Sequence, residues 1–90
     1  MTWRVEWLPE AQKQLRRLDK PVQDQILTYC RKRLATNEDP RRFGTELVGN
    51  LGGFWRYRIG DYRIICEFEN ECLLVMVVEA GHRRDIYRGH

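Results

Sequence analysis

Long apolar runs are missing from this sequence. The longest uncharged apolar stretch is Cys72 to Val78, and the first residues, MTWRVEWLPE, contain no apolar core of the kind found in signal peptides. A membrane-spanning helix needs about 20 predominantly apolar residues, and a secretory signal needs an apolar core. The sequence therefore predicts a soluble protein of the cytoplasm that has no membrane partner.

Cysteine is scarce as well, and its placement argues against two kinds of small domain. Cys30, Cys66 and Cys72 are odd in number, and none of them belongs to a CxxC pair. Disulfide frameworks use even numbers of cysteines, and zinc sites use closely spaced pairs of ligands. We therefore expect reduced thiols, most of them packed in the core, and no metal site.

What is present describes one folded domain, residues 1–90. Apolar residues make up 42% of the chain and charged residues 32%, which is typical of a globular protein. The formal net charge is only +3, and residues 51–90 hold six arginines against six acids. An anion site in this half must therefore come from placing the two signs on different faces.

Apolar periodicity predicts a strand and two helices at the start of the chain. Alternation over residues 2–7 indicates a half-buried strand, and Pro9 and Pro21 each suit the first turn of a helix. The first helix is expected to end near Lys20. The expected buried positions of the two helices are Leu8, Ala11, Leu15 and Leu18, then Val22, Ile26, Tyr29, Cys30 and Leu34.

The second half predicts a sheet. Segment 37–53 is polar and glycine-rich, which indicates a loop with one ordered stretch around Glu46 to Val48. Three strands are expected at 54–59, 62–69 and 72–80, with two-residue turns at Gly60–Asp61 and Asn70–Glu71. The result is an α+β domain of order β-α-α-β-β-β, whose helical hairpin packs on one face of a mainly antiparallel, twisted sheet.

The stretch FWRYRIGDYR, residues 54–63, predicts a hairpin with arginines on one face. A two-residue turn places Arg58 directly opposite Arg63, and side chains then separate by parity. The face expected to meet the helices holds Trp55, Tyr57, Ile59, Tyr62, Ile64, Cys66 and Phe68. The other face, expected to be uncovered, holds Phe54, Arg56, Arg58, Arg63 and Ile65.

The residues alone leave two interpretations of these arginines open. They can be solvated residues of an exposed sheet face, paired with Glu67 or with acids of the tail. Two directly opposed arginines, however, are unfavourable by up to about 1 kcal/mol unless an anion or an acid lies between them. The second interpretation is therefore an anion-binding face.

The tail, GHRRDIYRGH, adds further polar groups. A two-residue turn at Asn70–Glu71 predicts Arg63 opposite Val78, so that the chain leaves its last strand close to the arginines. Because His82, Arg83, Arg84 and Tyr87 follow at once, we expect one cleft with several guanidiniums, an imidazole and a phenol. A surface position for His82 and an edge-sealing position for Tyr87 are the simpler alternatives.

Together, WRYRIGDYR, AGHRRDIY and the helical segment PEAQKQLRRLDKPVQDQI resemble the RelE toxins of the RelE/ParE superfamily of type II toxin–antitoxin systems. The resemblance covers nearly the whole chain. RelE-type toxins are ribosome-dependent endoribonucleases that cut messenger RNA in the ribosomal A site without a metal or other cofactor. The resemblance implies the same fold and the same activity for this chain.

The resemblance also implies roles in the attack of a ribose 2′-OH on the adjacent phosphorus. Arg63 is expected to stabilise the transition state, while Arg83 and the two arginines of strand 54–59 bind and orient the phosphate. Guanidiniums are poor proton carriers, so proton transfer falls to Tyr87 or His82. Tyr87 is equally suited to stack on a base.

Partners and alternatives complete the expectations. The basic residues Arg31, Lys32, Arg33, Arg41 and Arg42 are candidates for contacts with ribosomal RNA, although a solvated surface is the simpler interpretation of each. The resemblance implies a RelB-like antitoxin from a neighbouring gene that covers the helices or the sheet. Two other functions stay open: a ParE-like toxin that binds DNA gyrase, and an inert relative that binds RNA or an antitoxin.

Overall fold

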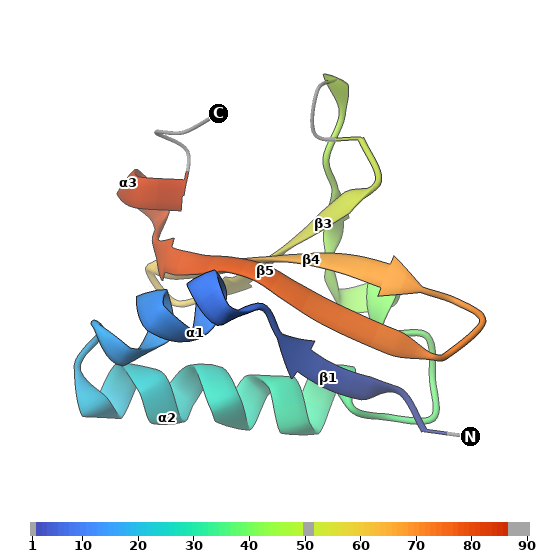
Figure 1. Cartoon of the computed structure of the whole chain (residues 1–90), viewed down its shortest axis with the longest axis horizontal. Coiled ribbons are helices and arrows are strands. Elements are labelled where there is room, and N and C mark those ends of the chain that lie inside the picture. Colours follow the sequence, from blue (N-terminus) through green and yellow to red (C-terminus); the bar gives the residue numbers. More distant parts are fainter. Residues whose placement is uncertain (1, 50–51, 87–90) are drawn as a thin grey trace.

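Five strands form one sheet, and two helices cover one of its faces (Figure 1). The structure is a computed structural model that describes residues 2–49 and 52–86. Across the sheet, the strands are β1 (Arg4–Trp7), β5 (Leu74–His82), β4 (Tyr62–Glu69), β3 (Phe54–Ile59) and β2 (Thr45–Glu46). Only the pair β1–β5 is parallel among these, so the predicted α+β class and mainly antiparallel sheet are confirmed.

A proline lies in the first turn of both helices, as predicted. Helix α1 (Pro9–Arg16) ends before Lys20, and α2 (Lys20–Tyr29) continues into a π-helical turn, η1 (Cys30–Leu34). The expected buried stripe is confirmed except at Leu8, which is 39% exposed. No helix among the described residues is long and apolar enough to cross a membrane.

The core lies between the helices and the covered face of the sheet. Its fully buried members include Ile26, Leu34, Tyr57 and Ile64, and aromatic edges pack beside them, with the ring centroids of Trp3 and Phe68 5.7 Å apart. All three cysteines are free. Cys30 and Cys66 are buried as expected, whereas Cys72 is exposed in the loop after β4.

The segment between η1 and β3 is more ordered than the sequence predicts. It contains a 3-10 turn, η2 (Pro40–Phe43), and the short strand β2, which pairs with β3 through Thr45–Arg56 and Glu46–Trp55. The predicted order of elements therefore lacks one strand. A two-residue strand is too short for its alternation to be recognised in the sequence.

The connection from β4 to β5 differs from the prediction. It is a four-residue loop, Asn70–Leu73, in which Leu73 adopts a φ of 49°, and a bulge between Ile65 and Cys66 shifts the register again. Arg63 therefore lies opposite Gly81 and not Val78. After β5, the short helix α3 (Arg83–Ile86) lies on the side of the sheet away from α1 and α2 (Figure 1).

Candidate functional site

The hairpin of β3 and β4 places the arginines in the predicted register. Gly60 has a φ of 63°, a left-handed conformation that glycine adopts without strain, and it forms the two-residue turn with Asp61. Arg58 lies directly opposite Arg63, and the pairing continues as predicted to Phe54 opposite Glu67. The turn therefore fixes which face each arginine occupies.

We call the side of the sheet turned away from α1 and α2 the arginine face. On β3 and β4 it carries Phe54, Arg56, Arg58, Arg63 and Ile65. Arg58 is exposed and Arg56 half-buried, but Arg63 is only 5% exposed and Ile65 only 4%. The expectation that this face is uncovered is therefore wrong at Arg63 and Ile65, because α3 lies on this side and contacts both β4 and β5.

Arg63 is held by the turn beside it. Its Nη1 donates hydrogen bonds to the carbonyl oxygens of Gly60 and Tyr62, each at 3.0 Å. These two dipoles stabilise a cation that has little water around it and has Arg58 directly opposite. Its Nε is also buried and has no hydrogen-bond partner among the described residues. Arg63 is therefore held in orientation by Nη1, while its Nε–H has no partner among the described residues.

Arg83 begins α3 at the same end of the sheet. Its backbone N–H donates to the carbonyl oxygen of Asp61 at 2.8 Å, which ties the start of α3 to the β3–β4 turn. The Arg83 side chain is exposed. The structure therefore brings Arg83 to the turn that lies between Arg58 and Arg63, even though the predicted register of β5 was wrong.

His82 does not join these arginines. It lies opposite Tyr62, and the two rings meet edge to face with their centroids 5.3 Å apart. Tyr62 packs against the core, so His82 occupies the helix-covered side of the sheet. Its Nδ1 accepts a hydrogen bond from the backbone N–H of Arg84 at 3.2 Å. Tyr87, the other predicted proton carrier, lies outside the described residues.

The corrected register adds one acid to the arginine face. Glu79 lies opposite Ile65, which in turn lies opposite Arg56, so one row across three strands reads Arg56, Ile65, Glu79. Glu79 is half-buried. The sequence does not predict Glu79 opposite Ile65, because a two-residue turn after β4 would place Met76 at that position. The acid within an otherwise apolar strand was the available signal.

The predicted ribosomal RNA contacts divide into exposed and engaged residues. Arg31, Lys32 and Arg33 are exposed on η1, and Arg42 is exposed on η2. The guanidinium carbons of Arg33 and Arg42 lie 5.0 and 4.3 Å from the ring centroid of Phe43. Arg42 also forms an ion pair with Glu38 at 2.8 Å. Arg31, Lys32 and Arg33 remain accessible to an anionic partner, because stacking on a ring does not use all the donors of a guanidinium.

Arg41 is instead part of the structure. It pairs with Asp39 at 3.0 Å, donates to the side chain of Asn70, and lies 4.7 Å from the Phe68 ring centroid and 5.6 Å from that of Trp3. Such contacts attach the loop after η1 to the far end of β4. Arg41 is therefore not available as a free contact for RNA.

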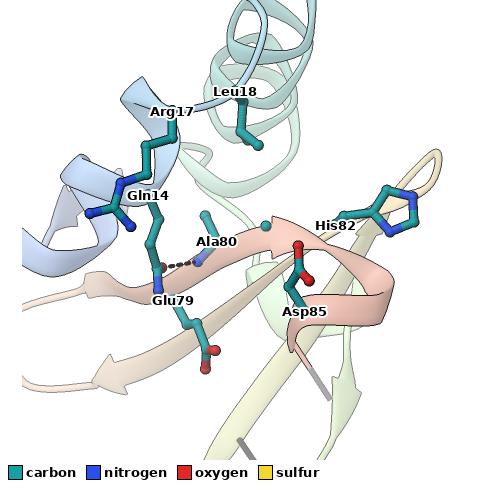
Figure 2. A pocket seen from close by; sticks show the side chains of 8 residues that line it. Gln14, Arg17, Leu18, Glu79, Ala80, His82 and Asp85 are labelled. Carbon is teal, nitrogen blue, oxygen red and sulfur yellow. Dashed lines mark hydrogen bonds between the residues drawn. The ribbon is translucent and has the colours of Figure 1, made fainter. Parts of the chain in front are cut away.

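A pocket lies beside the last part of β5, between α1 and α3. Its volume is about 260 Å³, and it is lined by Gln14, Arg17, Leu18, Glu79, Ala80, Gly81, His82 and Asp85 (Figure 2). Oε1 of Gln14 accepts a hydrogen bond from the backbone N–H of Ala80 at 2.8 Å. In the part of the chain that the structure describes, no three His, Cys, Asp or Glu side chains gather as a metal site.

The titratable groups beneath the hairpin are neutral. Burial raises the pKa of the Cys30 thiol to about 12, and it also raises the pKa values of the Cys66 thiol and the Tyr57 phenol. The Tyr57 hydroxyl donates to the carbonyl oxygen of Pro40 at 2.9 Å. These groups are therefore core residues and not proton carriers at neutral pH.

A helical hairpin on a small five-stranded sheet is the fold of solved RelE toxin structures that this chain matches. Residues 5–87 match the family model described as the ParE toxin of the type II toxin–antitoxin system parDE. The chain belongs to this family. It is a type II toxin of the RelE/ParE superfamily, and the resemblance noted in the sequence is confirmed.

Individual relatives agree with this assignment. Toxin RelG of Mycobacterium tuberculosis is 27% identical over 88 residues, which cover 98% of this chain and 99% of that protein. The RelE–RelB complex from Pyrococcus horikoshii matches at 29% identity with a TM-score of 0.69, over 92% of this chain and 97% of the matched one. The RelBE2 complex of Mycobacterium tuberculosis has a TM-score of 0.85 at 23% identity, over 92% and 93% of the two chains, which shows the fold.

Proposed function

We propose that this toxin is a ribosome-dependent endoribonuclease that cuts messenger RNA in the ribosomal A site and thereby inhibits translation. The observation that carries the proposal is the gathering of Arg58, Arg63 and the start of α3 at one turn, with Arg56 in the next row. Opposed guanidiniums repel each other, and their forked donors match phosphate oxygens. A bound phosphate would remove the repulsion.

The proposed reaction is attack of a ribose 2′-OH on the adjacent phosphorus. Arg63 is assigned to stabilising the phosphorane, while Arg56, Arg58 and Arg83 bind and orient the phosphate. Two carbonyl oxygens already orient Arg63, so its side chain loses less conformational entropy when a phosphate binds. A buried donor without a partner costs about 1–3 kcal/mol, so a phosphate oxygen at Nε of Arg63 would gain this amount.

Proton transfer is proposed for the tail. Tyr87 is the candidate that the family resemblance supports, either as a proton carrier or as a ring that stacks on a base. His82 has the better intrinsic chemistry, but its contact with Tyr62 turns it toward the helices. His82 is therefore not part of the proposed catalytic group. The exposed cations of η1 and η2 are proposed to contact ribosomal RNA.

The proposed partner is a RelB-like antitoxin. Structures of RelE with RelB from Pyrococcus horikoshii and Methanococcus jannaschii are among those that this fold matches. An antitoxin helix or extended segment that lies across the helices or the sheet would mask the basic surface. Both the ribosome and the antitoxin place the proposed activity in the cytoplasm.

The test is to induce the protein in cells and map the 5′ ends of messenger RNA. The proposal expects cuts in phase with codons, and it expects Arg58→Ala, Arg63→Ala and Tyr87→Phe to abolish or strongly reduce them. Arg16→Ala is the matched control, because it removes one exposed arginine from α1 on the other side of the sheet. Induction that arrests growth without any such cuts would refute the proposal.

One observation favours a second candidate. The matching family model is described as ParE and not RelE, and a ParE-like toxin would bind DNA gyrase without cutting RNA. The same cells distinguish the two candidates. A DNA damage response without codon-phased cuts would support gyrase binding, whereas cuts that Arg58→Ala removes would support the nuclease.

A further inference from the structure

Glu79 lies on the arginine face, one row away from Arg58 and Arg63, which are proposed to bind the phosphate. The row Arg56, Ile65, Glu79 lies next to the row Arg58, Arg63, Gly81. Glu79 is therefore a diagonal neighbour of Arg63 on the adjacent strand, and such neighbours lie about 7–8 Å apart at their backbones. Long side chains reach across such a diagonal.

The direction of the Glu79 side chain agrees with this placement. Figure 2 shows it leaving β5 on the side opposite to Ala80 and to the Gln14 amide that caps Ala80. Ala80 belongs to the helix-covered core, so Glu79 points to the arginine face. Two other acids of that face, Glu67 and Glu69, are exposed and lie in rows further from Arg63.

The proposed reaction needs a group that accepts a proton, and the arginines do not provide one. A guanidinium stays protonated throughout the physiological range, whereas a carboxylate is ionised at neutral pH and is an acceptor with two oxygens. Because His82 is turned toward the helices, Glu79 is the acid on the described part of this face closest to Arg63 in register.

The geometry points to Glu79 as the proton acceptor for the ribose 2′-OH, an inference that rests on the proposed nuclease function. The proton moves from O2′ to the Glu79 carboxylate while O2′ forms a bond to phosphorus. The bond between phosphorus and O5′ then breaks, and O5′ takes a proton, from Tyr87 if that residue is the proton carrier of the tail and otherwise from water. The products are a 2′,3′-cyclic phosphate, a free 5′-OH and a protonated Glu79, which returns its proton to solvent.

The inference predicts that the rate of cleavage falls at low pH, because a protonated Glu79 cannot accept a proton. We call this fall the acidic limb of the pH dependence. The charged and titratable groups around Glu79 are Arg17 just after α1, Arg56 and Arg58 on β3, Asp61 in the β3–β4 turn, Arg63, Glu67 and Glu69 on β4, His82 on β5, and Arg83, Arg84 and Asp85 on α3. Because other acids and an imidazole lie nearby, the fall in rate is assigned to Glu79 by the variant that removes it.

The experiment compares Glu79→Gln with wild type and with Glu69→Gln in single-turnover cleavage of messenger RNA on programmed ribosomes. Glu69→Gln is the matched control, since it makes the same change on the same face at the far end of β4. We expect Glu79→Gln to lose about 10²- to 10⁴-fold in the cleavage rate constant at unchanged apparent affinity, and to lose the acidic limb. Glu69→Gln should keep both.

Four outcomes overturn the inference. If Glu79→Gln keeps the wild-type rate and limb, Glu79 is not the acceptor; if it only binds ribosomes more tightly, Glu79 acts through charge alone. If Glu79→Gln does not fold, Glu79→Asp takes its place. Glu79→Asp keeps a carboxylate, so it must cut more slowly than wild type and still lose rate at low pH; a rate that does not fall at low pH contradicts the inference. A wild-type protein that cuts no RNA overturns the nuclease proposal together with this one.

Discussion

Alanine at Arg63 and alanine at Arg58 remove the same charge from two directly opposed positions, yet we expect different effects on stability. Arg63 is 5% exposed, and its Nη1 bonds two carbonyl oxygens at 3.0 Å. Hydrogen bonds from charged groups contribute about 1.5–3 kcal/mol each. Because one nitrogen serves both oxygens, we expect Arg63→Ala to lower the free energy of unfolding by about 2–4 kcal/mol.

Arg58→Ala should leave stability unchanged or increase it slightly. Arg58 is exposed, so its loss uncovers little apolar surface and leaves no buried carbonyl unpaired. It also removes the repulsion with Arg63, which is worth up to about 1 kcal/mol. The difference between the two variants therefore isolates the two carbonyl contacts, because both lose one guanidinium from the same pair.

Urea unfolding followed by tryptophan fluorescence measures this difference. Trp3 is buried in the core and Trp55 packs against it, so their emission reports unfolding. With a slope of about 1–1.5 kcal/mol per molar urea for a small domain, Arg63→Ala should unfold at a midpoint about 1–4 M lower than wild type. The reasoning is refuted if Arg63→Ala keeps the wild-type midpoint, or if Arg58→Ala falls as far.

Three further predictions concern the core and the basic surface. Tyr57→Phe should lower the free energy of unfolding by about 1–2 kcal/mol in the same urea assay, because the buried carbonyl of Pro40 loses its donor. The unfolded thiol of Cys30 ionises before the folded one, whose pKa is about 12, so stability should fall as the pH rises from 9.0 toward 12, by up to about 1.4 kcal/mol per pH unit. Urea titrations at several pH values in this range should show a smaller loss of stability per pH unit for Cys30→Ala than for wild type, and an equal loss would contradict the assignment. Arg31→Ala should weaken ribosome binding without a change in melting temperature, because Arg31 is exposed. Arg41→Ala should lower the melting temperature, because Arg41 holds the loop after η1 to β4. The reverse pattern would contradict the assignment of Arg31 to binding and of Arg41 to stability.

The β3–β4 hairpin was predictable because local rules determine it. The turn Gly60–Asp61 admits one tight geometry, and parity then assigns every side chain to a face. That Arg63 is buried was not predictable in the same way. Its burial depends on α3, a four-residue helix from the end of the chain that returns to the turn through the Arg83 N–H.

The β4–β5 register was not predictable because two irregularities add together. Asn70–Glu71 resembles a two-residue turn, but the loop runs to Leu73, which adopts a φ of 49° that the sequence does not signal for a leucine. The bulge after Ile65 adds one more residue. The combined shift moves Glu79 onto the arginine face and turns His82 toward the helices, so it changes the candidate site as well as the fold.

The bond between Gln14 and Ala80 has a consequence for how the toxin behaves before it meets a partner. β1 ends at Trp7, so among the described residues no strand lies beside the last part of β5 on that side. An open strand end is a template on which other chains can pair. The Gln14 amide occupies one of its donors, as a strand would. Gln14 therefore leaves one backbone donor fewer at this open stretch of β5 for another chain to pair with, a contribution that an assay of cleavage would not detect.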